Sequence, residues 1–183
     1  MAKLISKTYG EALFELAIEE QKLDELFCEA KEVRDILREN PDFGKLLNHP
    51  KIPREDKVKV AEETFKGRVS DELTGFLVLI IEKDRSHELD EIFIYFIDRV
   101  KEEKRIGTAY VTTAVELDKA TQMKVKQRLL ETTAYKEMEM NYIVDVSMIG
   151  GMVIRIGDRV IDTSITTKLN ELKKQLMKIF FLG

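Results

Sequence analysis

The sequence has 183 residues, of which 44% are hydrophobic and 35% are charged, and its formal net charge is −4. This balance excludes a chain-wide basic field of the kind that holds nucleic acid, whereas the hydrophobic content suffices for one large or two small cores. The single cysteine, Cys28, excludes an internal disulfide and a cysteine-based zinc cluster, and we expect it to be a core or boundary residue of a helix.

The start of the sequence predicts neither secretion nor membrane insertion. Residues 1–12 contain no apolar h-region and no run of arginine and serine, so we expect neither a signal peptide nor a transit peptide. The most apolar run, residues 76–81, is much shorter than the roughly 18 to 20 residues of a membrane span. We therefore expect a soluble protein that is able to dock on a membrane-bound partner.

Residues 1–105 are predicted to form one bundle of six helices. Apolar residues recur there at spacings of three and four, and Pro41, Pro53 and Gly67 mark helix ends. The predicted helices span residues 6–21, 23–37, 43–47, 53 to the Gly67 stop, 70–81 and 88–105. In the fifth of these helices, Ser70 is the predicted N-cap. This helix is apolar on nearly all sides, so we expect it to be the central helix of the bundle.

The first helix carries more apolar surface than one neighbouring helix needs. Its main stripe consists of Tyr9, Ala12, Leu13, Leu16 and Ala17. A bundle with apolar surface left over must bury that surface against a partner. The alternative, that the whole stripe fills the bundle core, is equally compatible with the pattern, because periodicity does not identify the neighbour.

After Gly107 the pattern predicts a small α/β domain over residues 106–183. Residues 109–115 alternate as a strand, Asp118 begins a helix, and residues 138–147 form a second strand that we expect to pair in parallel with the first. The side of that helix predicted to face the core contains Ala120, Met123, Gln127, Leu130 and Ala134.

A hairpin and a final helix complete this domain. Gly150 and Gly151 break the second strand, and Gly157-Asp158 forms a two-residue turn between strands 152–156 and 159–161. Asp162, Thr163 and Ser164 supply capping oxygens for a helix with a heptad seam of Ile165, Leu169, Leu172, Leu176 and Ile179. This seam either covers the small sheet or accepts a long partner helix.

No pattern in the sequence predicts a catalytic, cofactor or metal site. The segment around Gly150-Gly151 lacks the spacing of a phosphate-binding loop, and a strand rather than a helix follows it. His49 and His87 stand next to turn residues without carboxylate or cysteine clusters, so we expect both at the surface. We expect Asp145, Asp158 and Asp162 to have local tasks at a strand end, a turn and a cap.

The whole chain resembles the delta subunit of the rotary F-type ATP synthase, a relative of the mitochondrial oligomycin-sensitivity-conferring protein. The resemblance rests on a C-terminal signature and on shorter matches in the first half. The signature comprises Asp145, Ser147, Ile149, Gly150, Gly151, residues 153–157 with Gly157, residues 160–162, Ser164, Leu169, Leu172 and Leu176. The shorter matches are in residues 9–17, 47–50 and 76–85. The chain departs from the family pattern at Val146, where proline is common, and at Lys83-Asp84, where asparagine-glycine is common.

The resemblance implies an α+β, mainly α, fold and a non-catalytic stator role that couples rotation to proton or sodium transport and ATP synthesis. It implies that residues 1–105 bind the N-terminal segments of the alpha subunits, and that residues 106–183 join the C-terminal ends of the peripheral-stalk b subunits. We expect Tyr9, Ala12, Leu13, Leu16, Gly75 and Leu79 to contact the alpha subunits.

The same resemblance implies one copy per complex, a monomer in isolation, no cofactor, and a position at the cytoplasmic face of a bacterial membrane. The alternatives from the residues alone are a helical adaptor unrelated to ATP synthase and a small-ligand-binding α/β protein.

Overall fold

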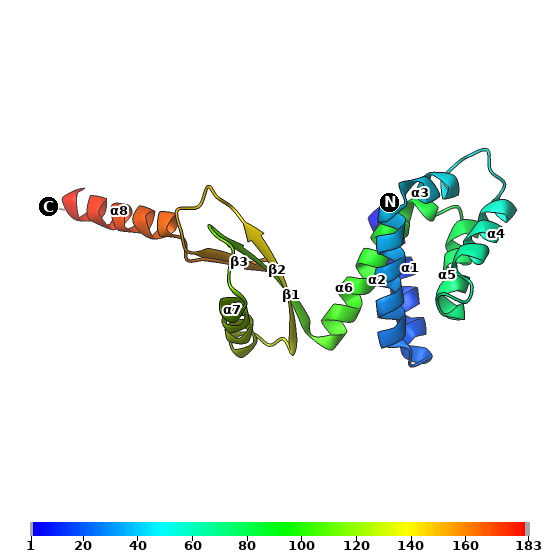
Figure 1. The fold of residues 1–183 in the computed structure, drawn as a ribbon, viewed down its shortest axis with the longest axis horizontal. Coiled ribbons are helices and arrows are strands. Elements are labelled where there is room, and N and C mark those ends of the chain that lie inside the picture. The colour runs from blue at the N-terminus through cyan, green and yellow to red at the C-terminus, as the bar shows by residue number, and fades with distance from the viewer. Residues whose placement is uncertain (1, 182–183) are drawn as a thin grey trace. The chain divides into compact units, whose positions relative to one another are not determined.

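The chain folds into two compact units. The computed structural model describes the backbone of residues 2–181 and the side chains of residues 4–175 and Met177. The units comprise residues 1–101 and 102–183, and Figure 1 shows that helices build the first, whereas the second holds a sheet and two helices. We predicted the division between residues 105 and 106, just beyond the end of the last helix of the first unit. Mainly helical secondary structure with one small mixed sheet confirms the predicted α+β class.

Helices in the first unit begin and end close to the predicted proline and glycine signals. Pro41 occupies the first turn of its helix and Pro53 directly precedes another, where a missing N–H leaves no hydrogen bond unmade. The first helix begins earlier than predicted. The elements are α1 (Ala2–Glu19), α2 (Leu23–Glu39), α3 (Pro41–Leu47), α4 (Arg54–Phe65), α5 (Asp71–Glu82), the 3₁₀ turn η1 (Ser86–Glu88) and α6 (Leu89–Lys104).

One hydrophobic core joins these helices, and it corrects two predictions. Cys28 is exposed, because α2 turns Leu26, Phe27, Ala30 and Val33 inward and Cys28 lies off that stripe. The helix expected at the centre, α5, leaves Leu79 41% exposed and Gly75 exposed as well. The helix with most buried positions is instead α6, which contributes Leu89, Ile92, Phe93, Phe96, Ile97 and Val100.

The second unit is built on a four-stranded sheet in the order β2-β1-β3-β4. Its strands are β1 (Ile106–Thr113), β2 (Glu137–Val144), β3 (Met152–Ile156) and β4 (Arg159–Asp162), and its helices are α7 (Lys119–Thr132) and α8 (Ile165–Phe181). The parallel pairing of β1 with β2 confirms the prediction, and β3 runs antiparallel to both β1 and β4. The β3–β4 hairpin turns at Gly157, as predicted, with φ of +54°.

Among the described residues, α7 covers one face of the sheet, and most of the residues that it buries there differ from the predicted ones. Leu129 is buried and Val125 packs against the same core. Of the residues that we predicted on the core side, Leu130 packs against this core, but Met123 is 72% exposed, and Ala120, Gln127 and Ala134 are exposed as well. The prediction failed because several small, amphipathic and polar residues on this short helix are compatible with more than one stripe.

Candidate functional site

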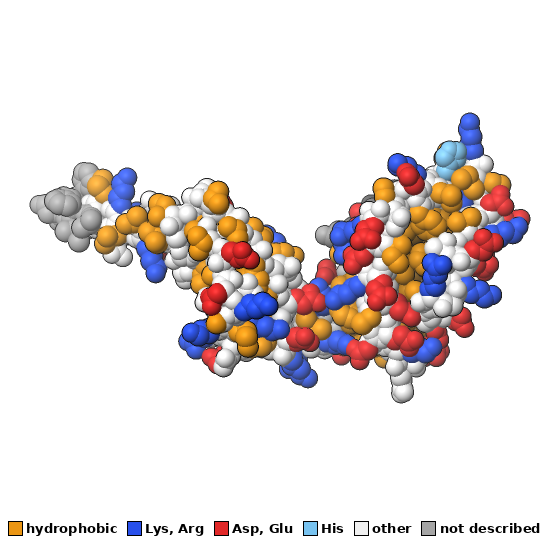
Figure 2. Space-filling model, in the orientation of Figure 1, with side chains coloured by type: hydrophobic (Ala, Val, Ile, Leu, Met, Phe, Trp, Pro, Cys, Tyr) orange, Lys and Arg blue, Asp and Glu red, His pale blue; other side chains and the backbone are white. Residues whose placement is uncertain are grey.

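An apolar groove lies between α1 and α5 in the first unit. Tyr9 and Leu16 are half-buried and pack against the bundle core, while Leu79 stands exposed on α5. The groove is lined by Thr8, Tyr9, Ala12, Glu15, Leu16, Glu19, Phe76 and Leu79. Figure 2 shows further hydrophobic side chains gathered on the first unit between α2 and the α4–α5 pair. The groove is therefore a surface on which an apolar segment of a partner is able to lie.

The predicted alpha-subunit contacts separate into three groups. Ala12, Tyr9, Leu16 and Leu79 line the groove. Gly75 is exposed on α5, and a Cβ added there would meet no neighbouring atom within 4 Å, so this position is accessible but does not line the groove. The expectation for Leu13 is wrong, because Leu13 is 0% exposed and belongs to the bundle core.

The rim of the groove is acidic. Glu15 and Glu19 both lie on the exposed side of α1, one helical turn apart, and no Lys or Arg lines the groove. Within the described part of the chain, neither carboxylate forms a hydrogen bond or an ion pair. A partner segment that combines apolar anchors with basic residues matches this surface. The sequence carried this signal as two glutamates flanking the α1 stripe, but they were not singled out.

Polar contacts hold α5 in place beside α1. The Ser70 hydroxyl accepts from the Leu73 amide at 3.4 Å, which confirms the predicted N-cap, and it donates to Glu29 of α2 at 2.6 Å. Lys22, between α1 and α2, donates to Glu72 at 2.7 Å. This hydrogen bond raises the pKa of Lys22 and lowers the pKa of Glu72. These contacts join the start of α5 to α2 and to the connection between α1 and α2.

A second apolar surface runs along α8 in the second unit. Ile165, Leu169 and Leu172 of the predicted seam are between 42% and 54% exposed, and Figure 2 shows hydrophobic side chains along this helix. The side chains of Leu176 and Ile179 lie outside the described residues. About half of each of these three described side chains is therefore left uncovered. Lys168, Lys173 and Lys174 stand beside the seam and are exposed, so the surface has a basic flank.

The signature residues of the second unit fix the direction in which α8 leaves the sheet. A Cβ on Gly151, whose φ is +85°, would lie 2.6 Å from the Thr163 carbonyl oxygen, so only glycine allows this approach. The Ile165 amide donates to the Gly150 carbonyl at 3.0 Å. Ser164 is buried, and its hydroxyl accepts from the Thr167 amide at 3.2 Å to cap α8.

The two signature aspartates perform local tasks, as predicted. Asp162 accepts from the Ser164 amide at 2.8 Å and from the Thr167 hydroxyl at 2.7 Å, and these bonds lower its pKa. Asp145 accepts from the hydroxyl and the amide of Ser147 at 2.6 and 2.9 Å, and its pKa is lowered for the same reason. Asp158 is exposed in the Gly157 turn. The three aspartates are thus distributed over a cap, a strand end and a turn.

Among the described residues, no group of three or more His, Cys, Asp and Glu side chains is arranged to hold a metal ion. His49 and His87 are both exposed, as expected. In the same part of the chain, no helix combines the length and the apolar character that crossing a bilayer requires.

Comparison with known proteins decides the family. The model of the ATP synthase delta (OSCP) subunit family matches residues 5–176. The chain belongs to this family. It is 56% identical to the ATP synthase subunit delta of Lachnoclostridium phytofermentans over 98% of both chains. It is 37% identical to that of Natranaerobius thermophilus, over 96% of this chain and 97% of the relative.

The fold agrees with this assignment. A chain of the Toxoplasma gondii mitochondrial ATP synthase hexamer superimposes with a TM-score of 0.74, covering 94% of this chain and 97% of that one at 20% sequence identity. As a member of the delta (OSCP) family, the protein is a non-catalytic stator component of an F-type ATP synthase and a peripheral part of that membrane-bound complex.

Proposed function

We propose that the protein joins two parts of the stator through separate surfaces. The groove between α1 and α5 binds the N-terminal segments of the alpha subunits, and the second unit, with the α8 seam, binds the C-terminal ends of the b subunits. In a bacterial cell this link lies at the cytoplasmic face of the membrane, with one copy in each complex. Such a link resists torque through buried apolar contact and needs no reacting group.

The observation that carries the head-side part is the α1–α5 groove itself. It presents Leu16, Phe76 and Leu79 between α1 and α5, and the polar contacts of Ser70 and Lys22 join α5 to α2 and to the connection between α1 and α2. Because the groove is already formed, binding of a helical segment costs no conformational entropy for ordering the groove, and this favours tight association. The acidic rim selects a segment that is basic beside its apolar anchors.

The stalk-side part rests on the exposed seam of α8. Leu169 and Leu172 are 54% and 52% exposed, although leucines at heptad spacing are typical of a helix that packs against another helix. The turn around Gly151 and the Asp162–Thr167 bond hold the start of this helix at the sheet. A stalk helix that packed along the seam would bury these leucines.

Binding of a synthetic peptide with the alpha-subunit N-terminal sequence to the full chain tests the head-side proposal. Burying the exposed 41% of Leu79 is worth about 1 kcal/mol, so Leu79→Ala is expected to weaken binding about fivefold. Leu79→Asp places a charge against the apolar segment and is expected to weaken it at least about tenfold.

Ile36→Asp is the matched control, because Ile36 is 44% exposed on α2 and does not line the groove. We expect this variant to bind as the unaltered chain does. Equal affinity of the Leu79→Asp and Ile36→Asp variants would show that the peptide binds elsewhere.

A further inference from the structure

The outer edge of the sheet at β2 offers unused backbone hydrogen-bonding groups. β2 ends the strand order, and no strand among the described residues pairs with its outer side. The Asp145 amide, directly after β2, donates to the Thr113 carbonyl of β1 at 2.8 Å. Because successive residues of a strand direct their backbone groups to opposite edges, Met138, Met140 and Tyr142 direct theirs outward.

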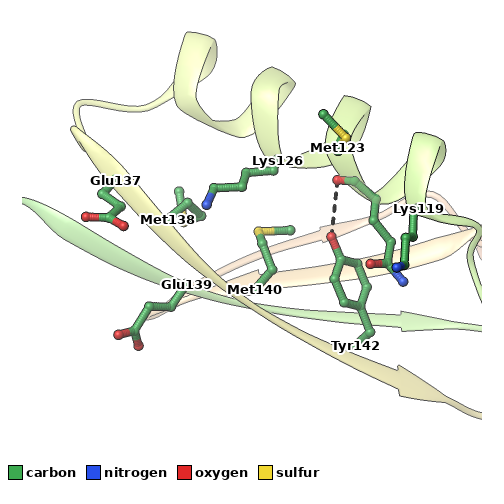
Figure 3. Close-up of a pocket in the computed structure, with 9 residues that line it drawn as sticks. Lys119, Met123, Lys126, Glu137, Met138, Glu139, Met140 and Tyr142 are labelled. Carbon is green, nitrogen blue, oxygen red and sulfur yellow. Dashed lines mark hydrogen bonds between the residues drawn. The ribbon is translucent and has the colours of Figure 1, made fainter.

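The same three residues also line a groove between β2 and α7. Figure 3 shows Met138, Met140 and Tyr142 on the strand below Met123 of the helix. Met123 is 72% exposed, and the Tyr142 hydroxyl is held by the Gln122 carbonyl at 3.2 Å. The free edge therefore stands next to an apolar floor rich in methionine, a side chain that adapts to different partners.

Two lysines of α7 and two glutamates of β2, Glu137 and Glu139, line this groove. Because the glutamates alternate along the strand with Met138 and Met140, their side chains belong to the face of the sheet opposite α7, and the lysines carry the charge on the α7 side (Figure 3). Lys119 and Lys126 line it from the helix side (Figure 3), and neither forms an ion pair or a hydrogen bond within the described part of the chain. Seven positions separate them, which corresponds to about 10 Å along a helix axis. Two acidic residues on the same face of an extended strand, four positions apart, lie about 13 Å apart and are within reach of both flexible lysine side chains.

We propose that the free edge of β2 and the adjacent groove bind an extended protein segment, which adds a fifth strand to the sheet. The backbone of the segment pairs with Met138, Met140 and Tyr142. On its side facing α7, acidic residues meet Lys119 and Lys126, and an apolar residue between them lies on the methionines. This recognition surface is distinct from the α1–α5 groove and from the α8 seam.

The test uses the isotope-labelled full chain and a ten-residue peptide with threonine on one face and the order Glu-Leu-Glu on the other. On binding, amide hydrogen exchange of Met138, Met140 and Tyr142 is expected to slow at least about tenfold, because these outward-pointing amides become paired with the bound segment. The amides of Glu139 and Asn141 face β1 already, so their exchange is expected to change less. This alternation distinguishes an added strand from any other bound form.

Charge variants test the chemistry of the partner. The double variant Lys119→Glu/Lys126→Glu is expected to weaken peptide binding about tenfold. Lys124→Glu, on an exposed position of α7 that does not line the groove, is the matched control and is expected to leave binding unchanged. A peptide with lysine in place of glutamate is expected to bind at least about tenfold more weakly.

Three results overturn the proposal. One is the absence of binding at a peptide concentration of about 1 mM, the weak end of specific recognition. Another is binding without the alternating protection at Met138, Met140 and Tyr142, as a helical occupant would give. The last is equal binding of the glutamate and lysine peptides.

Discussion

In the first unit, Leu13 and Leu79 allow the clearest test of which leucines belong to the core and which to the interface. Leu13 is 0% exposed in the bundle core, whereas Leu79 is 41% exposed at the groove. Replacing a buried leucine with alanine removes apolar contacts and leaves a cavity, so Leu13→Ala is expected to cost about 3 kcal/mol of unfolding free energy. For a unit of this size, that loss lowers the melting temperature by about 12 to 24 °C. Leu79→Ala is expected to cost less than about 1 kcal/mol.

Thermal unfolding of the full chain, followed by far-ultraviolet circular dichroism, measures the difference. Because the chain has two units, hydrogen exchange at the amides of α1 identifies which unit is destabilised. The reasoning is refuted if Leu13→Ala leaves the melting temperature within about 3 °C of the unaltered chain while it abolishes binding of the alpha-subunit peptide. That outcome would mean that Leu13 faces the partner.

Two further predictions concern the second unit. Gly151→Ala should destabilise it by about 1 to 3 kcal/mol, since its φ is +85° and a Cβ would lie 2.6 Å from the Thr163 carbonyl oxygen. Gly157 has a φ of +54°, and a Cβ there would have no neighbour within 4 Å, so Gly157→Asn should change the free energy of unfolding by less than about 1 kcal/mol in chemical denaturation. Similar losses at both glycines would refute the argument that the close contact with Thr163 requires glycine at position 151. Because hydrogen bonds from Ser164 and Thr167 lower the pKa of Asp162, its contribution to stability should be complete above about pH 4 and disappear as the pH falls through the lowered value. The resonance of the Ser164 amide, which donates to Asp162, should shift over the same pH range. Asp162→Asn should abolish this shift, and a shift that persisted in the variant would belong to another group.

Local chemistry allowed much of the second unit to be predicted. The two-residue turn at Gly157, the β-branched alternation and the capping oxygens around Ser164 each depend on a few adjacent residues. The alternation predicted a strand over residues 109–115, and β1 is observed at Ile106–Thr113. Parallel pairing of β1 with β2 followed from the helix between them, because a strand-helix-strand order favours that connection. In such cases the sequence specifies the structure through short-range geometry.

Positions that depend on a distant neighbour were predicted less well. Leu13 and Leu16 share one stripe in the sequence, but the crossing of the other helices makes Leu13 core and leaves Leu16 at the groove. Met123 and Cys28 were assigned to buried or boundary positions for the same reason, since a helical period places a residue on a face without saying what that face meets. The β2 edge was missed because strand order becomes evident only in the folded sheet.

Co-purification tests the central claim, a link with separate head and stalk surfaces, most directly. The full chain is used as bait in a detergent extract of membranes that contain the ATP synthase, and retained proteins are identified by mass spectrometry. We predict that the unaltered chain retains alpha and b subunits, that Leu79→Asp loses the alpha subunits alone, and that Leu169→Asp/Leu172→Asp loses the b subunits alone. Retention of neither subunit by the unaltered chain, or of both by each variant, would contradict the account.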